Sequence, residues 1–214
     1  MKRGLIVAVI GVDGSGKSTV IQAIESCINA TSPNNLFVVH LRPSLLPPLA
    51  RLKGIKSVTE GPVTNPHGSP PSGVLLSLAR VIYYTLDYVI GYWLKIRPKI
   101  AKRPAIVIFD RYAYDMVIDP LRFRIGISSK FVAMFTKFVP KPDLLICLDA
   151  PVEVILSRKK ELPKEEIQRQ IEALRQFAHK ESNAYWISTD RPVQEIANEI
   201  LSIISDYRRR SKRH

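Results

Sequence analysis

Residues 11–18 read Gly-Val-Asp-Gly-Ser-Gly-Lys-Ser, a pattern whose chemistry is the binding of phosphate groups. The glycines of a G-x-x-x-x-G-K-S loop let the backbone curve around phosphates with its N–H groups pointing inward. Lys17 supplies a cation for the β- and γ-phosphates, and the hydroxyl of Ser18 suits a magnesium ion. The sequence therefore predicts a site for ATP and magnesium.

A second acidic ligand for magnesium is expected where another strand ends. Four apolar residues, 106–109, lead directly to Asp110. The alternative is an aspartate that only caps the end of the strand. Arg111 follows, and its guanidinium could bind an acceptor phosphate through two parallel hydrogen bonds or form a surface salt bridge.

The segments around these residues alternate between short apolar runs and helical patterns. We expect strands at residues 5–10, 36–41, 105–109, 143–148 and 184–188. Helices are expected at about residues 17–30, 72–97, 151–156, 163–181 and 192–207. Parallel strands require helical crossovers, so the predicted class is α/β, a three-layer P-loop NTPase fold with a five-stranded parallel sheet flanked by helices. Ligands of such sheets bind beyond the carboxyl ends of the strands.

The chain is strongly basic, with 32 Lys and Arg against 19 Asp and Glu and a net charge of +13. This balance predicts an anionic ligand or surface, such as a nucleotide, nucleic acid or acidic membrane. Two cysteines, Cys27 and Cys147, are too few for a disulfide framework and are typical of a reducing compartment. With no secretory signal, a cytoplasmic location is expected.

Four motifs in chain order resemble those of the thymidylate kinase family. They are the loop 11–19, Asp110-Arg111-Tyr112, the stretch 142–149 and Ser157-Arg158-Lys159-Lys160-Glu161-Leu162. In that family ATP donates its γ-phosphate to the 5′-phosphate of deoxythymidine monophosphate (dTMP). The resemblance implies the same activity here, with ATP and Mg²⁺ required.

The resemblance also implies roles for individual residues. The residues expected to bind ATP are Gly11, Val12, Asp13, Gly14, Ser15, Gly16, Lys17, Ser18, Thr19, Arg158 and Asp190. The residues expected to bind the acceptor are Asp13, Arg42, Arg80, Arg111 and Tyr112. Lys17, Asp110, Arg111 and Arg158 would be catalytic, and Ser18 and Asp110 would hold the metal.

Two departures from the family pattern concern the acceptor. The family has Arg-Glu-Pro-Gly after the second strand, where this chain has Arg42-Pro43-Ser44-Leu45. Ile90 stands at the spacing of the family's thymine-reading arginine, so dTMP is expected to have little advantage over other pyrimidine monophosphates. A P-loop kinase acting on a nucleoside, a sugar or another metabolite is one alternative. A nucleotide-binding regulatory module is the other.

We expect a single P-loop kinase domain over residues 1–207, with a short lid near residues 158–165. A basic tail, residues 208–214, would follow and could contact nucleic acid or an anionic membrane weakly. Residues 42–72 hold seven prolines and little periodicity, which indicates a functional or mobile loop.

The helix expected at residues 72–97 should end before Pro98. Its apolar stretch has the length of a membrane span, but it carries Arg80 and Asp87, and charges inside a lone span are costly. We therefore expect no transmembrane segment. The helix should instead lie within the protein or in a subunit interface, and a homodimer is expected.

Overall fold

The computed structural model describes residues 4–31, 35–47, 67, 70–102 and 104–211. The chain forms two compact units. The sheet unit comprises Met1–Leu41, Pro98–Tyr112 and Lys141–His214, and the helical unit comprises Arg42–Arg97 and Ala113–Pro140. The single domain expected from the sequence stays a prediction.

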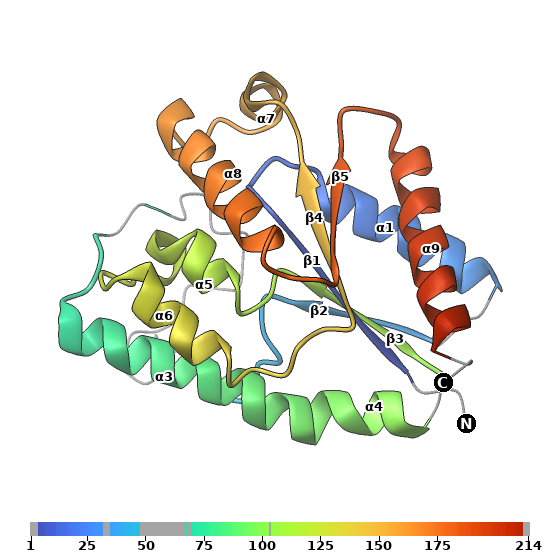
Figure 1. The fold of residues 1–214 in the computed structure, drawn as a ribbon, viewed down its shortest axis with the longest axis horizontal. Coiled ribbons are helices and arrows are strands. Elements are labelled where there is room, and N and C mark those ends of the chain that lie inside the picture. Colours follow the sequence, from blue (N-terminus) through green and yellow to red (C-terminus); the bar gives the residue numbers. More distant parts are fainter. Residues whose placement is uncertain (1–3, 32–34, 48–66, 68–69, 103, 212–214) are drawn as a thin grey trace. The chain divides into compact units, whose positions relative to one another are not determined.

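The sheet unit is built on five parallel strands (Figure 1). In spatial order they are β2 (Leu36–His40), β3 (Ile106–Asp110), β1 (Leu5–Gly11), β4 (Leu144–Asp149) and β5 (Ala184–Ser188). Each residue of the central strand from Leu5 to Ile10 is at most 2% exposed. Such uninterrupted burial is typical of a strand covered on both faces. The predicted α/β fold with a five-stranded parallel sheet is confirmed.

Successive side chains of a strand point to opposite faces of the sheet. Because the central strands carry apolar side chains on both faces, helices must cover both of them. Val7 and Val9 of β1 share one buried cluster with residues of α1 (Lys17–Thr31) and α9 (Val193–Arg210), and these two helices contact each other. On the strands beyond β1, α8 (Lys164–Ala178) packs against β4 and β5. The helix α7 (Val152–Arg158) contacts α8 in turn.

The helical unit is a small bundle. It contains α3 (Val74–Gly91), the π-helix η1 (Tyr92–Ile96), α5 (Asp115–Ile118), the 3₁₀-helix η2 (Pro120–Phe123) and α6 (Ser129–Thr136). α6 packs against α3 and α5 (Figure 1). The sequence analysis missed α6, although Ser128, a favoured residue type at a helix start, stands directly before it as the N-cap.

The expected helix end before Pro98 is wrong. The chain turns through η1 and continues as α4 (Arg97–Lys102). In an α-helix the ring of Pro98 would meet the carbonyl of Leu94, four residues earlier, and Pro98 offers no N–H to the ladder. The wider i→i+5 turns of the π-helix lie directly before the proline, which is one of the ways that helices accommodate such a residue.

The last helix, expected at residues 192–207, continues beyond its expected end. α9 extends to Arg210, so three of the basic residues assigned to the tail form the last helical turn. Arg208 donates a hydrogen bond to the carbonyl of Pro104 at 2.7 Å, and its partial burial lowers the pKa of its guanidinium. Cations at this end of a helix interact favourably with its dipole. The remaining residues, 212–214, lie outside the described part of the chain.

Candidate nucleotide-binding site

Residues 11–16 turn tightly between β1 and α1. Gly14 and Gly16 have φ angles of 88° and 86°, a left-handed conformation that other residues adopt only at a cost. A Cβ atom on Gly11 would lie 2.5 Å from the carbonyl oxygen of Leu148 on β4. The shape of the loop therefore depends on glycine at all three positions, for two different reasons.

Lys17 folds back over this loop. Its Nζ donates hydrogen bonds to the carbonyl oxygens of Gly11, at 2.9 Å, and Val12, at 2.8 Å, and its side chain is 7% exposed. α1 begins at Lys17 and has no acidic residue in its first turn, so its positive dipole end is not offset there. Ser18 and Thr19, next on the helix, are exposed.

The residues present fit a phosphate group. The loop combines left-handed glycines, a helix N-terminus and a nearby ammonium group, which together attract anions. In addition, the buried hydroxyl of Ser15 has no hydrogen-bond partner within the part of the chain that the structure describes. A buried hydroxyl of this kind is costly unless something binds to it.

Asp13 is the only acidic residue of the loop, and it lies between two cations. Its Oδ1 accepts a hydrogen bond from Nη2 of Arg111 and lies 3.8 Å from Nζ of Lys17. Arg111 has a φ of 76°, unusual for a residue with a side chain, and its N–H donates to the carbonyl of Val9 at 2.9 Å. Strained backbone of this kind is common at functional sites.

Asp110 ends β3, beside the central strand, where its register partner on β1 is Val9. On its other side the register partner is His40, the last residue of β2. His40 Nδ1 lies 3.3 Å from Asp110 Oδ2. The sequence analysis gave His40 no role. Its place at a strand end, level with Asp110, is the signal that could have identified it.

Arg158 ends α7 and lies against the loop. Its guanidinium donates to Oγ1 and the carbonyl oxygen of Thr189, at 3.3 and 3.0 Å. A Cβ atom on Gly16 would lie 3.6 Å from its Nη1. The arginine expected in the lid is thus held beside the phosphate loop by the residue that follows β5. Asp190, next along the chain, is exposed.

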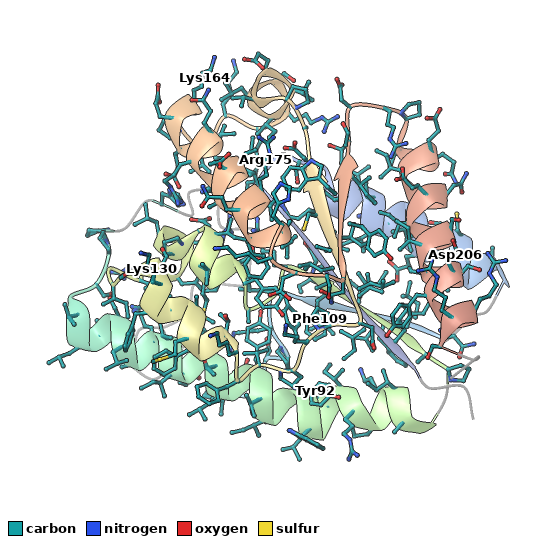
Figure 2. The ribbon with its side chains drawn as sticks, in the orientation of Figure 1. Tyr92, Phe109, Lys130, Lys164, Arg175 and Asp206 are labelled. Atoms are coloured by element: carbon teal, nitrogen blue, oxygen red, sulfur yellow. The ribbon has the colours of Figure 1, made fainter. Side chains whose placement is uncertain are left out.

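Asp149, at the end of β4, is a further titratable group in the sheet unit. Burial raises the pKa of this carboxyl, while the N–H of Ala150 and the nearby Arg175 and Trp186 oppose the shift. Its Oδ1 has no hydrogen-bond partner among the residues that the structure describes. Arg175, labelled in Figure 2, lies over the Trp186 ring with its Cζ 5.5 Å from the centroid. The sequence analysis assigned no role to Asp149.

The residues expected to bind the acceptor fall in both units. Asp13, Arg111 and Tyr112 belong to the sheet unit, and Arg42 and Arg80 belong to the helical unit. Tyr112 is buried and packs edge-on against Phe109, with the ring centroids 5.1 Å apart (Figure 2 labels Phe109).

Arg80, on α3, is 8% exposed and donates a long hydrogen bond, 3.5 Å, to the carbonyl of Phe123. Burial raises the pKa of the nearby Tyr84 hydroxyl, and the positive charge of Arg80 opposes that shift. Among the described residues it forms no ion pair with a carboxylate, and its Nε has no partner. Arg42 is different, because it forms an ion pair with Asp87 at 2.8 Å.

Comparisons of the sequence with known proteins all find thymidylate kinases. The sequence model of the family described as thymidylate kinase matches residues 71–200. The chain is 26% identical to a probable thymidylate kinase 1 of Saccharolobus solfataricus over 206 residues, 93% of this chain and 96% of that protein. It is 30% identical to a probable thymidylate kinase of Pyrobaculum aerophilum over 153 residues, 71% of this chain and 68% of that protein.

Solved structures agree at the level of the fold. The structure of a thymidylate kinase from Ehrlichia chaffeensis superposes with a TM-score of 0.62 at 15% identity, covering 94% of this chain and 99% of that one. The structure of the thymidylate kinase of Candida albicans superposes with a TM-score of 0.65 at 16% identity, covering 95% and 92%.

Proposed function

The chain belongs to the thymidylate kinase family, and we propose on that ground that it transfers the γ-phosphate of ATP to the 5′-phosphate of dTMP. The observation that carries the proposal furthest is the loop 11–16 with Lys17 folded over it, because this geometry suits the phosphates of a nucleotide. The products would be ADP and deoxythymidine diphosphate.

On the donor side, Lys17 and Arg158 would place positive charge around the transferring phosphoryl group. Transfer between phosphates needs positioning and charge more than covalent chemistry from the protein. Ser18 and Asp110 would hold magnesium, which when bound offsets the charge of the β- and γ-phosphates. Asp13 and the carbonyl of Val9 hold Arg111 through hydrogen bonds. Its guanidinium would help to position the phosphates of both substrates.

On the acceptor side, Arg42 would bind the phosphate of dTMP, and Arg80 is the candidate for the base. A guanidinium that is nine-tenths buried without a carboxylate partner in the described structure is costly, unless a ligand supplies a polar group. Arg80 could donate to a carbonyl oxygen of thymine. Arg80→Ala should therefore reduce the use of dTMP, and Arg80→Lys should restore it only in part.

One assay tests the function. Purified protein is supplied with ATP and Mg²⁺ and with dTMP, deoxyuridine monophosphate, deoxycytidine monophosphate, thymidine or a phosphorylated sugar. We expect turnover with the pyrimidine monophosphates and none with thymidine or the sugar. Turnover with thymidine or the sugar alone would assign the chain to a different acceptor, and no turnover at all would leave a nucleotide-binding module.

We also propose that the chain is a homodimer in the cytoplasm. Large apolar side chains are exposed along α3, η1, α6 and the turn after α6: Leu75, Ile82, Leu86, Trp93, Leu94, Phe131, Met134 and Phe138. Exposed apolar side chains in this number, on helices of one unit, support a protein interface. Light scattering should give twice the monomer mass, and Leu86→Lys should give the monomer mass.

The helical stretch that starts with α3 also has the length of a membrane span. Val74–Ala101 is long and apolar enough to cross a bilayer. However, 39% of its most apolar stretch is buried inside the protein. One such helix is weak evidence for a membrane protein.

A further inference from the structure

Asp87 is a fully buried carboxylate on α3 whose hydrogen-bond partners, among the residues that the structure describes, all lie in the segment 42–46. Its Oδ1 accepts from the N–H groups of Leu45, at 2.8 Å, and Leu46, at 2.7 Å. Its Oδ2 accepts from the N–H of Ser44, at 3.2 Å, and from Nη1 of Arg42, at 2.8 Å. With 0% exposure, this charge is stable only because all of these donors surround it.

The segment 42–46 is held from a second direction. Lys95, in the π-helix η1, donates from Nζ to the carbonyls of Pro43 and Ser44, at 3.0 and 2.8 Å. Gly91 lets the segment approach α3, because a Cβ atom there would lie 2.4 Å from Cβ of Pro43. Ser44 itself has a φ of 51°, which costs energy in a residue other than glycine. The segment therefore has a defined conformation that α3 and η1 impose.

The outcome of this arrangement is the orientation of Arg42. Its Nη1 makes both of its hydrogen bonds to the protein, to Asp87 and to the carbonyl of Leu46 at 3.2 Å. Its Nη2 and Nε make none to the residues that the structure describes. The Cζ atom lies 5.9 Å from the centroid of the Tyr84 ring, which supports the guanidinium on one side. The edge left available is the one that binds two oxygens of a phosphate in parallel.

We propose that Asp87 is a positioning residue for the acceptor: it holds Nη1 of Arg42 so that the Nε–Nη2 edge is presented to the acceptor phosphate. This inference rests on the proposed function and deepens it, because it names the group that orients the arginine. Asp87 does not touch the substrate. It acts through Arg42, and Lys95 and Gly91 keep the backbone of the segment in place.

The two oxygens of Asp87 have separate tasks, and this makes the inference testable. In Asp87→Asn the amide oxygen can keep the bonds to Leu45 and Leu46, while the amide NH₂ would face the donors of Arg42 and Ser44. Asp87→Asn should thus free Arg42 and leave the segment folded. Asp87→Ala should lose both functions.

We expect Asp87→Asn to raise KM for dTMP by about 10- to 100-fold, with KM for ATP within about twofold of the wild type and a smaller change in kcat. Hydrogen exchange at the amides of Leu45 and Leu46 should stay slow in Asp87→Asn and become fast in Asp87→Ala. Combining Asp87→Asn with Arg42→Ala should raise KM for dTMP no further than Arg42→Ala does alone.

Asp119→Asn is the matched control. Asp119 is a buried carboxylate of the same helical unit, bonded to Arg122 at 3.2 Å and to His67 at 2.7 Å. Its substitution should lower Tm but leave KM for dTMP unchanged. The inference is overturned if both variants shift KM alike, or if the effects of Asp87→Asn and Arg42→Ala add. A wild-type protein that uses no nucleoside monophosphate would instead refute the proposed function.

Discussion

Asp13 and Arg111, far apart in the sequence, meet side chain to side chain at the phosphate loop. The side chain of each is 11% exposed. The Nζ atom of Lys17 lies 3.8 Å from the same carboxylate oxygen of Asp13. One carboxylate therefore holds two cations near the place expected for the phosphates. A phosphate that binds there would compete with Asp13 for both, so that the two cations can be released from Asp13 to the substrate.

Lys17→Ala should reduce kcat about 10³-fold, because it removes a charge that acts on the transferring phosphoryl group. The fold should remain, since the two carbonyls to which the lysine donates and its ion-pair partner Asp13 all belong to its own loop. Steady-state kinetics and circular dichroism test this, with Gln22→Ala, an exposed position on the same helix, as the control. Near-normal turnover of Lys17→Ala would exclude the loop from catalysis.

Gly11→Ala and Gly16→Ala should destabilise the protein to different degrees. In Gly16→Ala the left-handed φ should lower the free energy of unfolding by about 1 kcal/mol. The new Cβ atom would have no neighbour nearer than 3.6 Å among the described residues. In Gly11→Ala the new methyl group would lie 2.5 Å from backbone of β4, which cannot move without separating two central strands. Urea unfolding should therefore show the larger loss for Gly11→Ala, and the opposite order would contradict the loop geometry.

Asp149→Asn should change how stability depends on pH. Because burial raises the pKa of Asp149 in the folded state, the folded protein keeps a proton that the unfolded chain releases from about pH 3.9 upward. The stability from this proton is complete below that pH and is lost as the pH rises through the folded pKa. The asparagine never ionises. The free energy of unfolding of the variant, relative to the wild type, should therefore rise with pH and then level off, whereas a constant difference would show that Asp149 is not the titrating group.

Arg208→Ala should lower Tm, whereas Arg210→Ala should not. Arg208 donates to the carbonyl of Pro104 and is partly buried, while Arg210 is exposed at the end of the same helix. The lost hydrogen bond is worth about 0.5–1.5 kcal/mol. Thermal unfolding of both variants measures the difference. Equal Tm values for the two variants would show that the bond of Arg208 to Pro104 does not stabilise the fold.

The sheet could be predicted from the sequence because its strands are short, apolar and separated by helices, and the observed strand ends agree within a residue or so. The loop 11–18 was equally clear, since glycine spacing and lysine position are local features. Helix α6 and the continuation past Pro98 could not be predicted as easily. Both depend on packing or on a rare turn, and local propensity describes neither.

The contacts of Asp87 show what is hardest to predict from a sequence, namely which distant segments meet. In the sequence Asp87 is one of two charges, with Arg80, in an apolar stretch, and it argued only against a membrane span. Its partners lie at residues 42–46, and no local pattern links the two segments. His40 and Asp110 are a comparable pair that only the strand register brings together. Expected roles for the individual site residues accordingly stay predictions until the variants are measured.

The central position of β1 has a consequence for the chain during its synthesis. β1 leaves the ribosome long before its neighbours in the sheet, because β3 begins at Ile106 and β4 at Leu144. At about 5–20 residues per second, synthesis of the chain between β1 and β4 takes roughly 7 to 26 seconds, during which β1 lacks at least one of its partners. The backbone of Leu148 is one wall of the phosphate loop, beside Gly11. A nascent chain therefore cannot complete its nucleotide site until β4 has been made, and the apolar β1 needs protection from aggregation until then.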